Sequence, residues 1–138
     1  MIILDTNVLS ETLRPAPADS VSRWMKAQPS ISLFTTTICE AEIFYGLALM
    51  PRGRRRARLE QALTAIFEED LADRILPFDS TAARAFASIA AKRRALGRPI
   101  SEFDAQIAAI ADSLGATLAT RNVEDFAACG IKVISPWE

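Results

Sequence analysis

Four polar side chains have the type and spacing to do chemistry together: Asp5, Glu42, Asp104 and Asn122. Each follows a short apolar run or lies at the start of a helical pattern. Taken singly they have a plainer interpretation, because Asp5, Asn122 and a Ser101–Asp104 pair could all cap helices. Taken together they form an oxygen-only group. Such ligands favour hard cations such as Mg²⁺ or Mn²⁺ over zinc.

The composition supports chemistry that needs no imidazole. The 138 residues include 0 histidines, which excludes a Ser-His-Asp triad, a His-rich zinc site and a histidine pH switch. Cys39 and Cys129 are far apart in the sequence and form no metal or redox motif, so we interpret both as small apolar residues. The charges nearly balance, with 16 Lys plus Arg against 17 Asp plus Glu, so nucleic-acid binding would have to come from local patches.

The elements that must position these acids alternate between strand and helix. Apolar or β-branched runs predict buried strands at Ile2–Leu4, Ile31–Phe34, Ile75–Phe78, Thr117–Ala119 and Val133–Ile134. Between them, apolar residues recur at helical spacing. This pattern predicts a three-layer α/β/α, Rossmann-like fold with a mostly parallel central sheet of four to five strands. In such a sheet the ligand site lies beyond the carboxyl ends of the strands, where the four polar residues fall.

Two helix starts carry capping patterns. Thr37 to Glu40 reads as a capping box, and Ser101 to Asp104 as a version with a shorter acid. If Glu40 closes its box, Glu42 is free to point elsewhere. Gly97 and Gly115 stand where two helices should end.

The chain reads as one soluble domain. It has no apolar stretch long enough to span a bilayer, and its first residues reach a charge too soon for a signal peptide. There is no internal repeat or low-complexity linker. We therefore expect a single cytoplasmic α/β domain over residues 1–138, with no membrane association.

Several segments, in this order, carry a family resemblance: Ile3-Leu4-Asp5-Thr6-Asn7, Ala41-Glu42-Ile43-Phe44-Tyr45-Gly46, Asp104 ahead of Ile107-Ala108-Ala109, Thr120-Arg121-Asn122-Val123-Glu124-Asp125-Phe126, and Gly130 with Pro136-Trp137. They resemble the successive motifs of PIN-domain ribonucleases. The nearest subgroup is the VapC toxins of bacterial type II toxin–antitoxin systems, including the FitB-type branch. The resemblance covers essentially the whole chain and implies a single PIN domain.

The resemblance also implies a site. Asp5, Glu42 and Asp104 would be the acidic metal-site residues and would act with Asn122 in catalysis. The metal would be Mg²⁺, for which Mn²⁺ can substitute, and the reaction would be hydrolysis of RNA phosphodiester bonds by metal-activated water. The fourth position is often Asp in the family, and an amide there adds no charge. Asp125 could supply that charge or cap the helix after Asn122.

Substrate contacts are expected beside these residues, from Thr6, Asn7, Thr120 and Arg121. Two basic clusters offer further phosphate contacts: Arg52–Arg58, which also reads as a solvated helix face, and Lys92-Arg93-Arg94 with Arg98. RNA affinity carried by such contacts would fall with salt.

The resemblance further implies an inhibitory, DNA-binding antitoxin as cognate partner and a homodimer or higher toxin–antitoxin assembly. An apolar helical segment bearing Phe44, Leu47, Leu49 and Met50 could serve either partner, although at least half of it reads as ordinary core.

Two rival interpretations stay open. In a haloacid-dehalogenase-type phosphatase, Asp5 would be a covalent nucleophile, but Asn7 stands where a second Asp is wanted and no lysine is well placed. In a catalytically degenerate PIN-like binding module, the acids would be helix caps. Metal would then not stabilise the fold, since only a ligand of the native state raises its stability.

Overall fold

A parallel sheet forms the middle layer of the computed structural model, which describes residues 1–138. Its strand order is β3-β2-β1-β4-β5, and every neighbouring pair is parallel. The central strand β1 therefore lies between β2 and β4, and the strand order reverses there. The strands are β1 Ile2–Leu4, β2 Leu33–Thr36, β3 Ile75–Leu76, β4 Thr117–Ala119 and β5 Lys132–Ile134.

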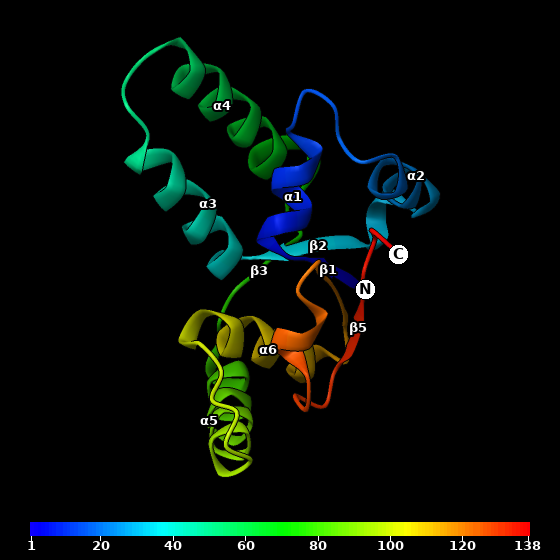
Figure 1. Cartoon of the computed structure of the whole chain (residues 1–138), viewed down its shortest axis with the longest axis vertical. Helices are drawn as coiled ribbons and strands as arrows, with labels where there is room; N and C mark the ends of the chain where they lie inside the picture. The colour runs from blue at the N-terminus through cyan, green and yellow to red at the C-terminus, as the bar shows by residue number, and fades with distance from the viewer.

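Helices cover both faces of this sheet. Figure 1 shows α1, α3 and α4 on one side and α5 and α6 on the other. The helices are α1 Thr6–Thr12, α2 Asp19–Ala27, α3 Thr37–Leu49, α4 Arg54–Ala65, α5 Ser80–Ala95 and α6 Glu102–Leu114. Shorter turns are the 3₁₀ turns η1 Ser30–Ser32 and η3 Val123–Phe126, and a π-helical turn η2 Ile66–Asp70. None of the helices combines the length and the apolar character needed to cross a membrane.

The core consists of two apolar clusters, one on each face. Successive side chains of a strand point to opposite faces, so Ile3 joins the cluster with α5 and α6 while Leu4 joins the one with α1, α3 and α4. A sheet buried on both faces needs strands that are apolar throughout, as β1 is. Helix α6 buries Ala108 and Ala109 completely, and small residues there let the helix approach the sheet closely. The predicted three-layer fold is confirmed.

One predicted strand is misplaced. Strands Ile2–Leu4 and Thr117–Ala119 have the predicted bounds, but the strand expected at Ile31–Phe34 runs from Leu33 to Thr36. Ile31 lies in η1 and is 79% exposed. The strand can end on two buried threonines because the Thr35 hydroxyl donates to the Leu4 carbonyl oxygen at 2.9 Å.

The expected capping box at Thr37 is wrong. Thr36 is the N-cap of α3, and its hydroxyl accepts the Cys39 N–H at 3.0 Å. The residue three positions after this N-cap is Cys39. Its thiol cannot accept the N-cap N–H as the carboxylate of a capping box would. At α6 the prediction holds, because Ser101 Oγ accepts the Asp104 N–H at 3.2 Å. Gly115 ends that helix in the left-handed conformation, as expected.

Candidate metal centre

Asp5 lies at the carboxyl end of β1, where its own N–H donates to the Ala119 carbonyl oxygen of β4 at 3.0 Å. The residue is 5% exposed. Both carboxylate oxygens accept hydrogen bonds: Oδ1 from Thr6 N–H at 2.8 Å and the Cys39 thiol at 3.8 Å, and Oδ2 from Thr120 Oγ1 at 2.7 Å and Asn7 Nδ2 at 3.4 Å. The Asp5 carboxylate is thus oriented by residues that follow three different strands, β1, β2 and β4.

Thr120 is the support of Asp5. Besides donating to Asp5, its hydroxyl accepts from Asn7 Nδ2 at 3.3 Å and from the Asn122 N–H at 3.1 Å. Thr120 is 0% exposed, so its hydroxyl serves Asp5 and not a phosphate arriving from solvent. This corrects the expected substrate contact of Thr120.

Glu42 faces Asp5 from α3. The Thr6 hydroxyl donates to Glu42 Oε1 at 3.1 Å. One ligand atom from each of Asp5, Cys39 and Glu42 lies within 4.8 Å of the other two. Asp104, in the first turn of α6, lies outside this closest group but near enough to feel its charge. The sequence prediction that Asp5, Glu42 and Asp104 lie at one edge of the sheet agrees with this arrangement.

The charged forms of all three carboxylates are disfavoured in the folded protein. Burial raises the pKa of Asp5, of Glu42 and of Asp104, and it is the largest cause for each. The charge of Asp5 further raises the pKa of both Glu42 and Asp104. A divalent cation would relieve both the poor solvation and the repulsion, so the donor set fits a hard cation.

Cys39 is a site residue that the sequence interpretation missed. Burial, followed by the nearby Asp5 charge, raises the pKa of its thiol to about 12. The thiol therefore keeps its proton and acts as a weak hydrogen-bond donor to Asp5, since only the thiolate binds metals well. The available signal was its position on α3, one helical turn before Glu42. Both cysteines are free and buried, as expected.

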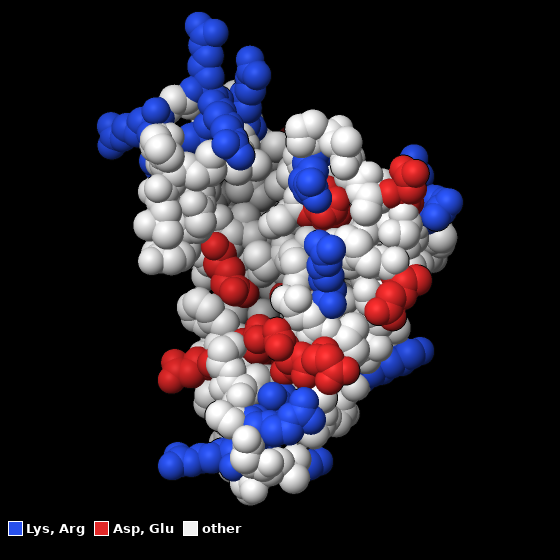
Figure 2. All heavy atoms as spheres, in the orientation of Figure 1, with Lys and Arg blue, Asp and Glu red and all other residues white.

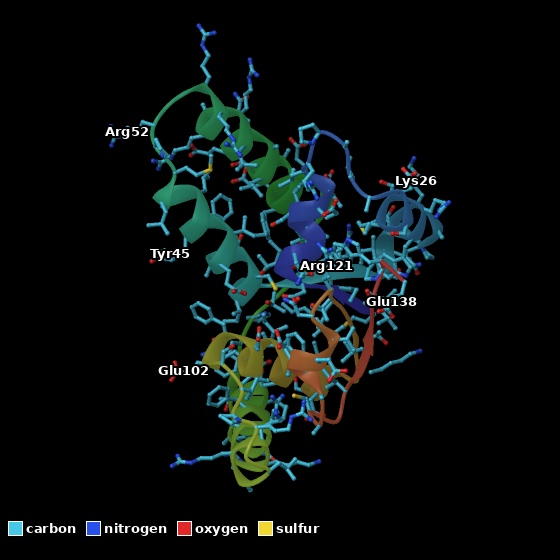
Figure 3. The ribbon with its side chains drawn as sticks, viewed as in Figure 1. Lys26, Tyr45, Arg52, Glu102, Arg121 and Glu138 are labelled. Carbon is cyan, nitrogen blue, oxygen red and sulfur yellow. The ribbon has the colours of Figure 1, made fainter.

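Asn122 and Arg121 lie at the outer rim of the centre. Asn122 is exposed and occupies the N-cap position of η3, as predicted, but its side chain makes no capping hydrogen bond. Its backbone N–H donates to Thr120 Oγ1 at 3.1 Å. The Arg121 N–H donates to Asn7 Oδ1 at 3.1 Å, and its guanidinium lies 5.2 Å from the centroid of the Trp137 ring. Figure 3 places Arg121 in the middle of the molecule, close to the end of β1.

The first basic cluster lies away from the acids. Figure 2 shows its blue side chains at the free end of the α3–α4 pair, while the red carboxylates gather over the start of α6 and over η3. Arg52, Arg54, Arg55 and Arg58 are exposed. These arginines therefore form a solvent-exposed face of the helix, at a distance from the acids, as the second of the two interpretations predicted.

The second basic cluster is split by burial. Lys92, Arg94 and Arg98 are exposed, but Arg93 is 5% exposed and points into the protein. Arg93 is therefore no surface phosphate contact, which corrects that part of the prediction. The periodicity of α5 gave no warning, because both neighbours of Arg93 are also basic.

The apolar segment of α3 is partly core, as expected. Leu47 is buried, and Phe44 packs on Phe67 with ring centroids 5.6 Å apart. On the other face, Leu49 is 67% and Tyr45 65% exposed. This exposed face continues along the outside of α3, where Figure 3 shows Tyr45 pointing away from the molecule.

The phosphatase interpretation fits this centre poorly. That chemistry wants a second acid beside the nucleophile to exchange protons with the phosphate ester. Beside Asp5 the structure places the amide of Asn7, whose Nδ2 donates to Asp5 Oδ2 at 3.4 Å and which cannot serve as that acid.

Known proteins are similar in sequence to this chain over nearly their full length. The chain is 45% identical over 138 residues to the "Plasmid stability protein StbB" of Pseudomonas syringae pv. tomato, covering 100% of this chain and 99% of that protein. It is 41% identical to the "VapC ribonuclease Y4jK" of Sinorhizobium fredii, with the same coverage.

A third relative and a solved structure match over similar lengths. "Toxin FitB" of Neisseria gonorrhoeae is 38% identical over 141 residues, covering 99% of each chain. The structure of FitAB bound to an IR36 DNA fragment matches with a TM-score of 0.94 at 36% identity, covering 100% of this chain and 96% of that one. The PIN domain model matches residues 2–131, so nearly every element described above lies within the match. This chain belongs to the PIN domain family.

Proposed function

We propose that the chain is the toxin of a type II toxin–antitoxin pair and acts as a Mg²⁺-dependent endoribonuclease, with residues 1–138 as one PIN domain. The observation that carries the proposal is the meeting of Asp5, Glu42 and Asp104 at one edge of the sheet, each with a raised pKa. The relatives named as a VapC ribonuclease, a toxin and a plasmid stability protein support the same activity.

Asp5 and Asp104 would hold the cation, with Mn²⁺ able to replace Mg²⁺, and Glu42 would add a third carboxylate. When bound, such an ion lowers the pKa of water and neutralises the charge that builds on a phosphate during in-line displacement. The reaction is hydrolysis: water adds to phosphorus, one P–O bond breaks, and the leaving oxygen gains a proton.

The chain's other groups would bind and orient RNA around that cation. Arg121, exposed and stacked on Trp137, can contact a phosphate while its backbone holds Asn7. The exposed Asn122 amide can donate to a phosphate oxygen or to water. Thr6 and Asn7 are half-buried beside Asp5 and complete this rim.

The test is RNA cleavage by the wild type and Asp5→Asn, each with Mg²⁺ and with EDTA. Cleavage is expected only from the wild type with Mg²⁺. Asp112→Asn is the matched control, because Asp112 is an exposed acid on the same helix as Asp104 and should leave cleavage unchanged. Equal cleavage in all conditions would refute the proposal.

A degenerate binding module is the alternative that a melting experiment separates. A cation that binds the native site must raise the melting temperature. We expect Mn²⁺ to raise it in the wild type and not in Asp104→Asn. A wild type that neither cleaves RNA nor gains stability with Mn²⁺ would favour the degenerate module.

The proposed partner is a cognate antitoxin that inhibits the enzyme and binds DNA. The FitAB–DNA complex of a 36% identical chain supports this assignment. Co-expression with a candidate antitoxin should yield a complex without RNA cleavage. The exposed Tyr45 and Leu49 face of α3 suits either a homodimer or a larger assembly. Light scattering of the isolated chain and of the complex distinguishes the two.

A further inference from the structure

Arg93 is a buried cation that forms no ion pair, although its charge contributes to lowering the pKa of Asp104. It lies in the last turn of α5 and is 5% exposed, and the ion pairs of the chain involve other residues, Arg14 with Glu11 and Arg98 with Glu124. Burying a charge is costly unless hydrogen bonds replace its water. The partners of Arg93 therefore indicate its role.

Those partners are mainly backbone carbonyls. Nη1 donates to the Asp125 and Ala127 carbonyl oxygens at 2.9 and 3.0 Å and contacts Cys129 Sγ at 3.5 Å. Nε donates to the Arg98 carbonyl oxygen at 2.7 Å. Arg93 thus ties the end of α5 to the turn η3 and to the residues just after it.

The opposite side of η3 faces the metal centre. Its N-cap residue Asn122 binds Thr120 through the backbone at 3.1 Å, and Thr120 binds Asp5 at 2.7 Å. The Asp125 N–H donates to the Asn122 carbonyl oxygen at 3.0 Å, so Asp125 belongs to the turn that reaches Asp5 through Asn122 and Thr120. In agreement with this place, the charge of Asp125 contributes to raising the pKa of Asp5 and of Asp104. Figure 2 shows carboxylates over the orange segment of Figure 1 that contains η3, next to those over the start of α6.

We propose that Arg93 is a positioning residue for the metal centre: by holding the carbonyls of Asp125 and Ala127, it keeps the Asp125 carboxylate beside Asp5 and Asp104. Asp125 then supplies the negative charge that the amide Asn122 does not. This inference rests on the proposed function, because it assumes that the acids hold a divalent cation.

The planar fork of arginine suits this task better than lysine does. Its Nε and Nη1 donate in fixed, diverging directions, so one side chain can bridge the Arg98 carbonyl and the two carbonyls around η3. A lysine ammonium keeps the charge but donates from a single atom. Arg93→Lys therefore removes the bridge without removing the cation.

The experiment measures Mn²⁺ affinity of the whole chain from the paramagnetic resonance signal of free Mn²⁺, below the melting temperature of every variant. Arg93→Lys and Asp125→Asn should each weaken binding on the order of tenfold, as partners of metal ligands do. The double variant should bind no more weakly than Asp125→Asn alone, because both changes act through one carboxylate. Arg94→Lys makes the same chemical change at the exposed neighbour and should bind as the wild type does.

Two results overturn the inference: wild-type affinity in Arg93→Lys, or a double variant whose loss is the product of the single losses. Should Arg93→Lys fail to fold, Asp125→Asn still decides, since Asp125 is exposed and wild-type affinity in that variant refutes the proposal. A wild type that binds no Mn²⁺ refutes the proposed function instead. The two failures are therefore distinguishable.

Discussion

The metal centre has two parts that are built differently. The strand-end part, Asp5 with Asn7 and Thr120, is buried or half-buried and closed by hydrogen bonds. The helix part, Glu42 and Asp104, is half-buried, and its carboxylates have fewer donors. Glu42 accepts from the Thr6 hydroxyl, and the nearby Ser101 side chain contributes to lowering the pKa of Asp104. The chain has therefore oriented the Asp5 carboxylate in advance, while Glu42 and Asp104 are held by fewer hydrogen bonds.

This difference gives the acids different roles: Asp5 contributes to both the fold and the chemistry, and Asp104 to the chemistry alone. Donors around Asp5 fix its geometry before any cation arrives, so changing Asp5 disturbs the fold as well as the chemistry. Removing the charge of Asp104 takes away a repulsion, so that change should harm only the chemistry. The predictions below test this contrast.

Asp5→Asn is expected to have the largest effect. Loss of the cation should slow RNA cleavage on the order of 10³-fold or more, because metal catalysis supplies several kcal/mol. The metal-free protein should also melt at a lower temperature, since the new amide must turn a donor toward either Thr6 N–H or the Thr120 hydroxyl. Cleavage assays and calorimetry in EDTA measure the two effects. An unchanged melting temperature would contradict the strand-end part of the comparison.

Asp104→Asn should abolish cleavage to a similar degree but raise the melting temperature of the metal-free protein near neutral pH. The reason is that the raised pKa of Asp104 marks a charge that the folded state disfavours. Calorimetry beside Asp112→Asn, with EDTA in both samples, provides the comparison. A fall in melting temperature as large as that of Asp5→Asn would erase the distinction between the two parts.

Thr120→Val should weaken Mn²⁺ binding by about 10- to 100-fold, because the variant keeps the shape but loses the donor to Asp5 Oδ2. Thr120→Ser retains the hydroxyl and should recover most of the affinity. Thr117→Val, at the start of the strand β4 that precedes Thr120, is the matched control. Isothermal titration with Mn²⁺ gives the affinities, and equal values for Val and Ser at residue 120 would show that the hydroxyl does not support Asp5.

Lowering the pH slightly below neutral should have the smallest effect of the four changes. The effect should grow as the pH falls further. Protons compete with the cation for carboxylates whose pKa is raised, so the stabilisation by Mn²⁺ should shrink as the pH falls below neutral toward those raised pKa values. In the metal-free protein the sign is opposite: these groups stabilise the fold when protonated, and that contribution is lost as the pH rises through their raised pKa values. The melting curves of the wild type with and without Mn²⁺ should converge at low pH, whereas those of Asp104→Asn should coincide at every pH.

The fold was largely predictable because its signals are local. Strands at Ile2–Leu4 and Thr117–Ala119 and the cap at Ser101 follow from runs and spacings within a few residues. The strand misplaced at Ile31 shows the limit, since a buried threonine such as Thr35 needs a partner from β1 that local sequence does not reveal. The cap at Thr36 was missed because two adjacent threonines can each begin a helix.

The sequence by itself determined the order of the acids along the chain, their places at strand ends, and a chemistry without imidazole. Only the tertiary structure decided that Thr120, 115 residues away, serves Asp5, that Cys39 keeps its proton beside that carboxylate, and that Arg93 lies inside while Arg94 lies outside. The physical reason is that burial and hydrogen-bond partners depend on contacts between distant segments. Those contacts set the solvation, and therefore the charge state, of each group in the centre.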